Sequence, residues 1–314
     1  MALSGKLFHQ QLLLGLIILA ATAANQDSQP DSSCSIYCGS LCIPYPFETR
    51  WGHYLDESFH INCDNTSGTP KPFLGNDKNL EVLNISLEGE LRVSSPVTRR
   101  CNVTSSYPVQ NISSKFPISY KRNNLIGVGL YSVSYITGLF GKQYGTGCVS
   151  LSSRHNDRRG GDSRVFNGSC SGDGCCYTSI PEGVTYFSVQ ALSLLENNSK
   201  CIFAFVVEKE AYKFSTLDLY FSQNRTTVPV VLDWAVGNET CKYAQRIQTN
   251  YACKAANSTC YDSNNGPGYR CYCSSGFKGN PYLHDGCQGT NTHLAKLCML
   301  DFNLLLLACC LMSI

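Results

Sequence analysis

Cysteine is the residue type that most constrains this chain. The sequence contains 19 cysteines, and sixteen of them, an even number, lie between Cys34 and Cys287. In an oxidising compartment such cysteines pair as disulfides, whereas in a reducing cytosol they remain thiols or bind metal. No Cys-x-x-Cys pair occurs and the six histidines are scattered, so the spacing does not favour zinc. We therefore expect a disulfide-rich extracellular protein without a metal or other cofactor.

The N-terminus has the pattern of a secretory signal peptide. Residues 12–21 are apolar, and Ala21-Thr22-Ala23 supplies the small residues of a cleavage site. Ten apolar residues are too few to cross a hydrocarbon core of about 30 Å as a helix, which argues against a membrane anchor. We predict that residues 1–24 are removed and that the chain passes through the secretory pathway, where Asn-x-Ser/Thr sequons are glycosylated. The sequons begin at Asn65, Asn84, Asn102, Asn111, Asn167, Asn197, Asn224, Asn238 and Asn257.

Strand patterns dominate the middle of the chain. Apolar, β-branched and aromatic residues alternate with other residues over residues 130–136, 186–191 and 202–207. No long stretch repeats apolar residues with a helical period, and residues 193–200 would form a short helix at most. The polar, glycine-containing stretch over residues 152–164 is expected to be a surface loop. We therefore predict a mainly β fold that disulfides hold together.

Residues 235–288 form a cysteine-dense segment. Six cysteines lie between Cys241 and Cys287 with few apolar residues among them, so the segment needs disulfides to fold. The Cys271-x-Cys273 pair, flanked on both sides by Gly-aromatic dipeptides, is similar to the end of an EGF-like module. Six cysteines permit fifteen pairings, and the sequence by itself does not choose among them.

Four stretches that occur in a fixed order resemble the ectodomain of plant wall-associated receptor kinases. The resemblance covers about residues 34–288 and rests on the ordered set rather than on one motif. The stretches are Cys34-x3-Cys38-Gly39 with Ile43-Pro44-Tyr45-Pro46-Phe47, then Tyr144-Gly145-Thr146-Gly147-Cys148, then Gly174-Cys175-Cys176-Tyr177, and last Asp233-Trp234-Ala235-Val236-Gly237 with Gly268-Tyr269-Arg270-Cys271 and Gly279-Asn280-Pro281-Tyr282.

The resemblance implies a multi-module extracellular protein. A galacturonan-binding, cysteine-rich module would cover residues 34–102, a β-rich middle segment residues 103–234, and an EGF-like module residues 235–288. For the EGF-like module the resemblance implies the pairs Cys241–Cys260, Cys253–Cys271 and Cys273–Cys287.

Bridges between residues 34 and 201 stay open. Cys42 stands where the family has another residue, and a cysteine expected soon after Phe47 is absent. The vicinal Cys175 and Cys176 are expected to bridge two different partners. Neither the motifs of a kinase domain nor the Gly-x-Ser-x-Gly elbow of hydrolases occurs, so we expect no enzyme activity.

Homogalacturonan carries a carboxylate on each sugar, so the resemblance implies a site of cations and aromatic rings. Arginine pairs both oxygens of a carboxylate. The formal net charge is only +2, so a polyanion site must be a local patch, and nucleic acid is not an expected partner. The alternative for each cation is an ordinary solvated charge. The candidates are Arg50, Arg99, Arg100, Lys121, Arg122 and Trp51, with Arg92 and Lys115 as further cations; the adjacent pairs Arg99-Arg100 and Lys121-Arg122 are the most suggestive.

We expect the chain to bind pectin or oligogalacturonides outside the cell, in the wall or at the outer face of the plasma membrane. A receptor kinase acting as co-receptor is a further partner that the resemblance allows. The alternative function is a protein-binding or structural extracellular module without affinity for saccharide. For the tail over residues 289–314, which is apolar from residue 304, three interpretations stay open: a GPI-attachment signal, part of a membrane helix, or the end of a truncated product.

Overall fold

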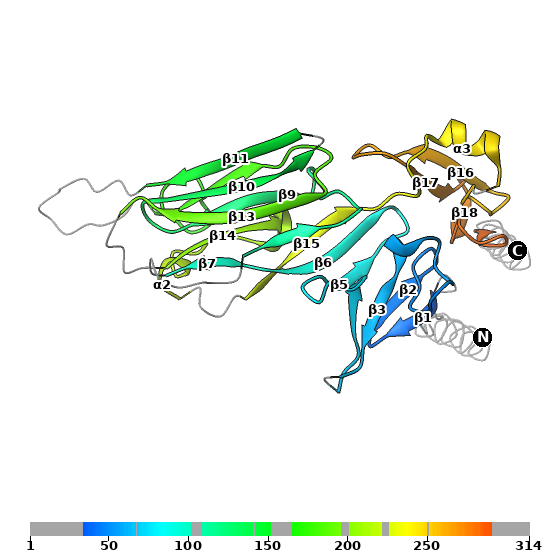
Figure 1. The fold of residues 1–314 in the computed structure, drawn as a ribbon, viewed down its shortest axis with the longest axis horizontal. Coiled ribbons are helices and arrows are strands. Elements are labelled where there is room, and N and C mark those ends of the chain that lie inside the picture. The colour runs from blue at the N-terminus through cyan, green and yellow to red at the C-terminus, as the bar shows by residue number, and fades with distance from the viewer. Residues whose placement is uncertain are drawn as a thin grey trace, which may run out of the picture.

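The computed structural model describes residues 34–66, 68–101, 109–140, 142–151, 165–195, 201–221, 226–249 and 251–290. Strands are the main element of this part of the chain, which confirms the mainly β, disulfide-rich fold. The molecule is elongated, with the long strands of the middle segment at one end and the N-terminal and C-terminal strands at the other (Figure 1). The predicted signal peptide, the loop over residues 152–164 and the tail beyond residue 290 lie outside the described residues.

A five-stranded antiparallel sheet follows the N-terminal hairpin, in the order β15-β6-β5-β4-β3. Its inner face is apolar because alternate residues of β6, such as Leu91 and Val93, are buried. Strand β15 comes from far along the chain and pairs with β6 throughout, with Val230 opposite Val93. The sheet therefore crosses the predicted module boundary at residue 102. Its strands are β3 (Ile61–Asp64), β4 (Lys71–Leu74), β5 (Glu81–Ile85), β6 (Glu90–Pro96) and β15 (Thr227–Asp233). The hairpin before it consists of β1 (Cys34–Cys38) and β2 (Leu41–Pro44).

Two four-stranded antiparallel sheets form the middle segment. The first, in the order β11-β10-β13-β8, contains β8 (Asn111–Ser113), β10 (Ser132–Phe140), β11 (Lys142–Ser150) and β13 (Tyr186–Ser193). The second, in the order β12-β9-β14-β7, contains β7 (Thr98–Arg100), β9 (Asn123–Val128), β12 (Cys175–Ser179) and β14 (Ile202–Glu208).

Strand β14 is buried on both faces. Its even-numbered apolar residues belong to the main core, which it shares with the first sheet, and its odd-numbered residues belong to a second cluster with Phe214 and Leu219. The three predicted strands lie in β10, β13 and β14. The first begins two residues later than predicted, because Tyr131 adopts a left-handed conformation with φ 52° in the preceding turn.

The C-terminal segment consists of two small hairpins and one short helix. Thr240 caps the helix, since its side chain accepts a hydrogen bond from the Tyr243 backbone N–H. The elements are α3 (Cys241–Ile247), β16 (Ser258–Asp262), β17 (Tyr269–Cys273), β18 (Phe277–Gly279) and β19 (Cys287–Gly289). Within the described ranges, the other helices are η1 (Glu57–Phe59), η2 (Lys209–Ala211) and α2 (Asp218–Phe221). Of the stretch over residues 193–200, in which a short helix was possible, residues 193–195 form no helix and residues 196–200 lie outside the described residues.

Eight disulfides join the sixteen cysteines between Cys34 and Cys287. Cys175 and Cys176 bridge different partners, as predicted. The three pairs of the C-terminal segment are the ones that the resemblance to EGF modules implies. The pairs are Cys34–Cys42, Cys38–Cys63, Cys101–Cys201, Cys148–Cys176, Cys170–Cys175, Cys241–Cys260, Cys253–Cys271 and Cys273–Cys287.

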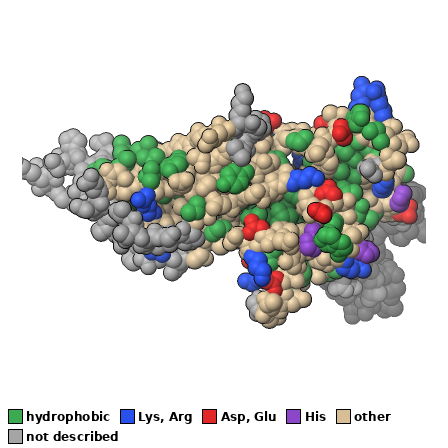
Figure 2. Space-filling model, viewed as in Figure 1, with side chains coloured by type: hydrophobic (Ala, Val, Ile, Leu, Met, Phe, Trp, Pro, Cys, Tyr) green, Lys and Arg blue, Asp and Glu red, His purple; other side chains and the backbone are tan. Residues whose placement is uncertain are grey.

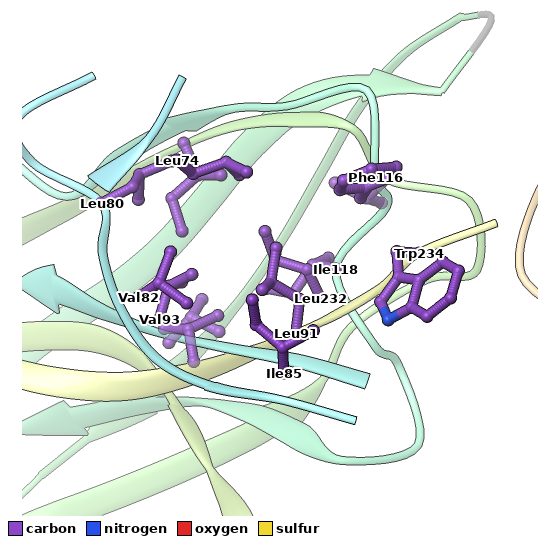
Figure 3. Packing of buried hydrophobic residues seen from close by; sticks show 14 of the residues in the cluster. Leu74, Leu80, Val82, Ile85, Leu91, Val93, Phe116, Ile118, Leu232 and Trp234 are labelled. Atoms are coloured by element: carbon purple, nitrogen blue, oxygen red, sulfur yellow. The ribbon is translucent and has the colours of Figure 1, made fainter. Parts of the chain in front are cut away.

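Trp234 lies where the N-terminal, middle and C-terminal segments meet. It directly follows β15 and is fully buried at the end of the core shown in Figure 3. Its ring centroid lies 5.4 Å from that of Phe47, 5.8 Å from that of Phe59 and 5.6 Å from that of Tyr282. The indole N–H donates to the carbonyl of Ser86 at 2.9 Å, so the polar end of the side chain is also satisfied.

Two buried asparagines fasten the C-terminal segment to the rest of the molecule. Asn265 donates to the Asp233 carboxyl at 2.7 Å and accepts from the Gly183 N–H at 2.6 Å. Asn280 donates to the Tyr45 carbonyl at 2.7 Å. Burial raises the pKa of Asp233 above its ordinary value, although the bond from Asn265 opposes this. These side-chain bonds add polar contacts beside the aromatic cluster around Trp234, and their directionality helps to fix its geometry.

The two tryptophans of the chain provide a matched test of this junction. Because Trp234 is fully buried, Trp234→Ala is expected to lower the free energy of unfolding by about 3–5 kcal/mol. Trp51 is exposed, so Trp51→Ala is expected to change it by less than about 0.5 kcal/mol. Denaturant unfolding followed by circular dichroism measures both, and equal losses would contradict the assignment of Trp234 as the central contact.

Candidate functional site

Residues 49–59 form a loop, called the Trp51 loop below, whose two ends the backbone holds together. Glu48 and His60 form a parallel bridge, and the Glu48 N–H donates to the Phe59 carbonyl at 3.3 Å. Phe47 precedes the loop and Phe59 is its last residue; both are fully buried, and they pack edge to face with ring centroids 5.0 Å apart. The loop is therefore mounted directly on the aromatic cluster around Trp234.

The Glu48 carboxylate organises the first turn of the Trp51 loop. Its Oε1 accepts from the Thr49 N–H at 2.9 Å and from the Arg50 N–H at 3.4 Å, and its Oε2 accepts from the Arg50 guanidinium at 3.5 Å. Burial raises the pKa of Glu48, but these donors outweigh burial and hold the pKa below its ordinary value. Glu48 is thus a fixed anion at neutral pH, buried at the base of the loop.

Trp51 projects from this loop into solvent. Its exposed fraction is 77%, the highest among the exposed large hydrophobic residues of the described chain. Its ring meets Tyr54 with centroids 5.9 Å apart and His60 at 6.5 Å, in both cases edge to face. Sequence reasoning did not single out Tyr54 and His60, because folding rather than a recognisable motif brings their rings to Trp51. The neighbouring Arg50 side chain is 65% exposed.

The second half of the Trp51 loop is tied to the segment after β8. The Asp56 carboxylate caps η1 by accepting from the Ser58 N–H at 2.9 Å, and it accepts from the Lys115 ammonium at 3.2 Å. Burial raises the pKa of Asp56, but Ser58 and Lys115 lower it further, so the pKa lies below its ordinary value. Lys115, one of the candidate cations, is therefore engaged in an ion pair that holds the loop.

Arg99 and Arg100 lie on β7, away from the Trp51 loop along the long axis of the molecule (Figure 1). As neighbours in a strand they point to opposite faces. The Arg99 guanidinium donates to the Cys101 sulfur at 2.9 Å and lies 5.9 Å from the Phe203 ring centroid. Arg100 donates to the Ala191 carbonyl at 3.5 Å. The adjacency that made this pair suggestive does not place the two charges on one surface.

Arg122 is bound in a network of carboxylates. Its guanidinium lies 2.8 Å from Glu208 and 3.4 Å from Glu90, and Arg92 lies 2.7 Å from the same Glu208 carboxylate. The neighbouring Lys121 lies with its ammonium 5.5 Å from the Tyr120 ring centroid. Of the six candidates, the structure brings Arg50 and Trp51 together in one loop. On the face shown in Figure 2, Lys and Arg side chains are scattered rather than gathered in one patch.

Two cavities border the N-terminal sheet. One, of about 630 Å³, lies between the β1–β2 hairpin and β5, and its charged lining residues are Glu81 and Glu88. The other, of about 610 Å³, lies beside the Trp51 loop and is lined by three carboxylates and the ammonium of Lys115. Both linings would repel a carboxylate-bearing polysaccharide. The cavities are therefore less suited to a polyanion than the exposed surface of the Trp51 loop.

The predicted glycosylation sites agree in one respect with the structure. Six of the nine sequon asparagines fall within the described residues, and each of the six is exposed, as attachment of a glycan requires: Asn65, Asn84, Asn111, Asn167, Asn238 and Asn257. Asn102, Asn197 and Asn224 lie outside the described residues. Occupancy stays a prediction.

Within the ranges that the structure describes, no group of three or more His, Cys, Asp or Glu side chains is arranged to hold a metal ion. In the same ranges, no helix has the length and apolar character needed to cross a membrane.

Comparison with known proteins assigns this architecture to a class. Residues 34–95, which contain the Trp51 loop, match the family model described as wall-associated receptor kinase galacturonan-binding. This match supports an extracellular, receptor-like role at the cell wall.

Individual relatives from Arabidopsis thaliana make the relationship specific. Wall-associated receptor kinase 2 is 36% identical over 277 residues, which cover 84% of this chain and 35% of the relative. Wall-associated receptor kinase 5 is 34% identical over 298 residues, covering 90% of this chain and 38% of the relative. The chain is therefore homologous over most of its length to wall-associated receptor kinases, which confirms the resemblance, and it spans about a third of their length. No solved structure matches it.

The lowered pKa values at the base of the Trp51 loop predict how its stability depends on pH. A carboxyl whose pKa is lower in the folded state stabilises the fold above its unfolded pKa, and this contribution is lost as pH falls through the folded pKa. Glu48 therefore contributes near pH 6 and loses its contribution in the acid range below about pH 4. We expect Glu48→Gln to lower the melting temperature at pH 6 and to flatten its acid dependence. Glu182→Gln, at an exposed position, is the matched control, and parallel pH profiles for Glu48→Gln and wild type would contradict the prediction.

Proposed function

We propose that this chain binds de-esterified homogalacturonan outside the cell through the Trp51 loop. The observation that carries the proposal is the combination of a largely exposed indole and an exposed guanidinium, at Trp51 and Arg50, in the segment that matches the galacturonan-binding family model. The indole would stack on the face of a sugar ring. The guanidinium would pair the carboxylate of the same or the next sugar.

The loose contact between Arg50 and Glu48 is compatible with a weak, multivalent mode of binding. Arg50 is held by Glu48 at 3.5 Å, which is long for an ion pair, and most of its side chain is exposed. Its guanidinium can therefore turn from Glu48 to a ligand carboxylate at small cost. An exposed ion pair contributes only up to about 1 kcal/mol, so stacking on Trp51 must supply a comparable share. A repeating polymer offers many equivalent positions, and this raises the apparent affinity without new contacts.

Binding of the purified ectodomain to de-esterified homogalacturonan tests the assignment of the site. We expect Trp51→Ala to weaken binding by roughly tenfold, equivalent to about 1.4 kcal/mol, because it removes the stacking surface. Arg50→Gln is expected to weaken it about two- to fivefold, as for an exposed ion pair. Tyr261→Ala and Arg246→Ala, at exposed positions of the C-terminal segment, are the matched controls.

The outcomes separate the site from the function. If Arg99→Ala with Arg100→Ala weakens binding while the Trp51 loop variants do not, the polysaccharide binds at β7 and the site is wrong. If the wild-type protein does not bind the polymer at all, the galacturonan proposal fails, and the alternative of a protein-binding extracellular module takes its place.

Salt provides an independent prediction for the same site. Because the proposed contact between Arg50 and the polymer is an exposed charge pair, binding is expected to weaken as ionic strength rises from 0.01 M to 0.15 M, where the Debye length falls from about 30 Å to about 8 Å. The dependence should be shallower for Arg50→Gln than for wild type. Fully methyl-esterified pectin, which lacks the carboxylates, is the control ligand, and equal binding of both polymers would contradict the charge pairing.

A further inference from the structure

The sheet formed by β8, β10, β11 and β13 has one face in the core and one in solvent. Ile112, Ile136 and Phe187 point inward from three of its strands and are fully buried. The residues that alternate with them therefore point outward. The six that matter here, called the outer face below, are Asn111, Tyr135, Thr137, Tyr186, Ser188 and Gln190. None of the six is charged, which distinguishes this surface from the Trp51 loop.

The strand register places a glycosylation sequon at the edge of the outer face. Asn111, the first residue of the sequon Asn111-Ile112-Ser113, is exposed on the edge strand β8 and lies opposite Ser188 of β13. Ser188 lies opposite Thr137 of β10. The three side chains therefore form a row across the sheet. Because neighbouring strands lie about 4.8 Å apart, the row from Asn111 to Thr137 is about 10 Å long, a span that the first two sugars of an N-glycan can cover.

Aromatic side chains flank this row. Tyr186 stands two residues from Ser188 along β13 and is 43% exposed. Tyr135 stands two residues from Thr137 along β10, and its hydroxyl donates to the Gln190 side-chain carbonyl at 2.5 Å. Gly147 of β11 lies opposite Tyr135. A side chain at this position would crowd Tyr135, because an added Cβ would lie only 2.9 Å from the Tyr135 Cβ. The row is thus bordered by two tyrosines, one of which is held in place by a hydrogen bond.

We propose that the N-glycan attached to Asn111 folds back across the outer face and packs its first sugars between Tyr186 and Tyr135. The core sugars of an N-glycan are neutral and present apolar faces together with hydroxyl and amide groups. An uncharged surface of tyrosine rings, hydroxyls and the Gln190 amide matches that chemistry. A galacturonan chain would instead need cations, which the six residues do not supply. Because the N-glycan is attached at Asn111, its first sugars lie closer to the outer face than any free saccharide.

Such packing also has a structural consequence for the sheet. Strand β8 is an edge strand of this sheet, and the outer backbone groups of an edge strand are a template for pairing with another chain. A glycan that covers the edge and the adjoining tyrosines blocks that pairing. The proposal requires glycosylation of Asn111, and it does not depend on galacturonan binding at the Trp51 loop.

Site-resolved deglycosylation of the folded protein tests the proposal. The protein is secreted with uniform oligomannose glycans and treated with an endoglycosidase, and release at each sequon is followed by mass spectrometry of glycopeptides. In the folded protein, release at Asn111 is expected to be about tenfold slower than at Asn257, equivalent to about 1.4 kcal/mol of protection. After denaturation the two rates should be equal. Asn257 is an exposed sequon of the C-terminal segment and serves as the internal reference.

Substitutions then separate the tyrosine contacts from crowding at the edge strand. Tyr135→Ser and Tyr186→Ser should each accelerate release at Asn111 and leave release at Asn257 unchanged. Tyr177→Ser, on β12 of the other sheet and 59% exposed, is the matched control and should have no effect. Gln190→Ala, which frees Tyr135 without removing an aromatic ring, provides a second variant if a tyrosine variant folds poorly. An unmodified Asn111 in secreted protein, release as fast as at Asn257, or rates insensitive to both tyrosines would each overturn the proposal.

Discussion

The packing of Trp234 against aromatic side chains from both ends of the chain is the contact on which the arrangement of the molecule depends. Phe47 and Phe59 approach it from the N-terminal segment and Tyr282 from the C-terminal one. Trp234 itself follows β15, the strand that completes the N-terminal sheet by pairing with β6. The N-terminal and C-terminal segments thus share one hydrophobic core with the middle of the chain and are not separately packed modules. The hydrogen bonds of the buried Asn265 and Asn280 side chains add geometrically specific polar contacts to this mainly apolar junction.

The strands of the middle segment could be predicted because their residues alternate or are uniformly apolar. The pattern over residues 186–191 corresponds to β13 and that over residues 202–207 to β14. Closure of the N-terminal sheet by β15 could not be predicted, since pairing between distant strands leaves no local mark in the sequence. The same limit applies to the bridges. The resemblance implied no partner for Cys42, and only the structure shows that it pairs with Cys34.

The grouping of cations was the least predictable feature of the candidate site, for two physical reasons. Adjacent residues of a strand point to opposite faces, so Arg99 and Arg100 on β7 do not form one patch. Charged side chains far apart in the sequence also form ion pairs with one another: Arg92 and Arg122 both bind Glu208. Arg50 and Trp51 are neighbours in a turn rather than in a strand, and there adjacency in sequence does bring side chains onto one exposed loop. Two adjacent basic residues in the sequence therefore indicate a charged patch only when the backbone conformation at those residues is known.

The mounting of the Trp51 loop gives the proposed galacturonan site a defined surface on a nearly neutral protein. Both ends of the loop continue into fully buried phenylalanines that contact Trp234, and the Glu48 carboxylate fixes the first turn from below. Buried side chains and hydrogen bonds hold the base of the loop, so the proposed stacking of a sugar ring on the indole would cost little conformational entropy. A loop without that base would lose part of the stacking free energy in becoming ordered. The aromatic cluster that joins the segments of the chain therefore also supports the loop that carries Trp51. The stability of the junction is thus coupled to the geometry of the proposed binding site.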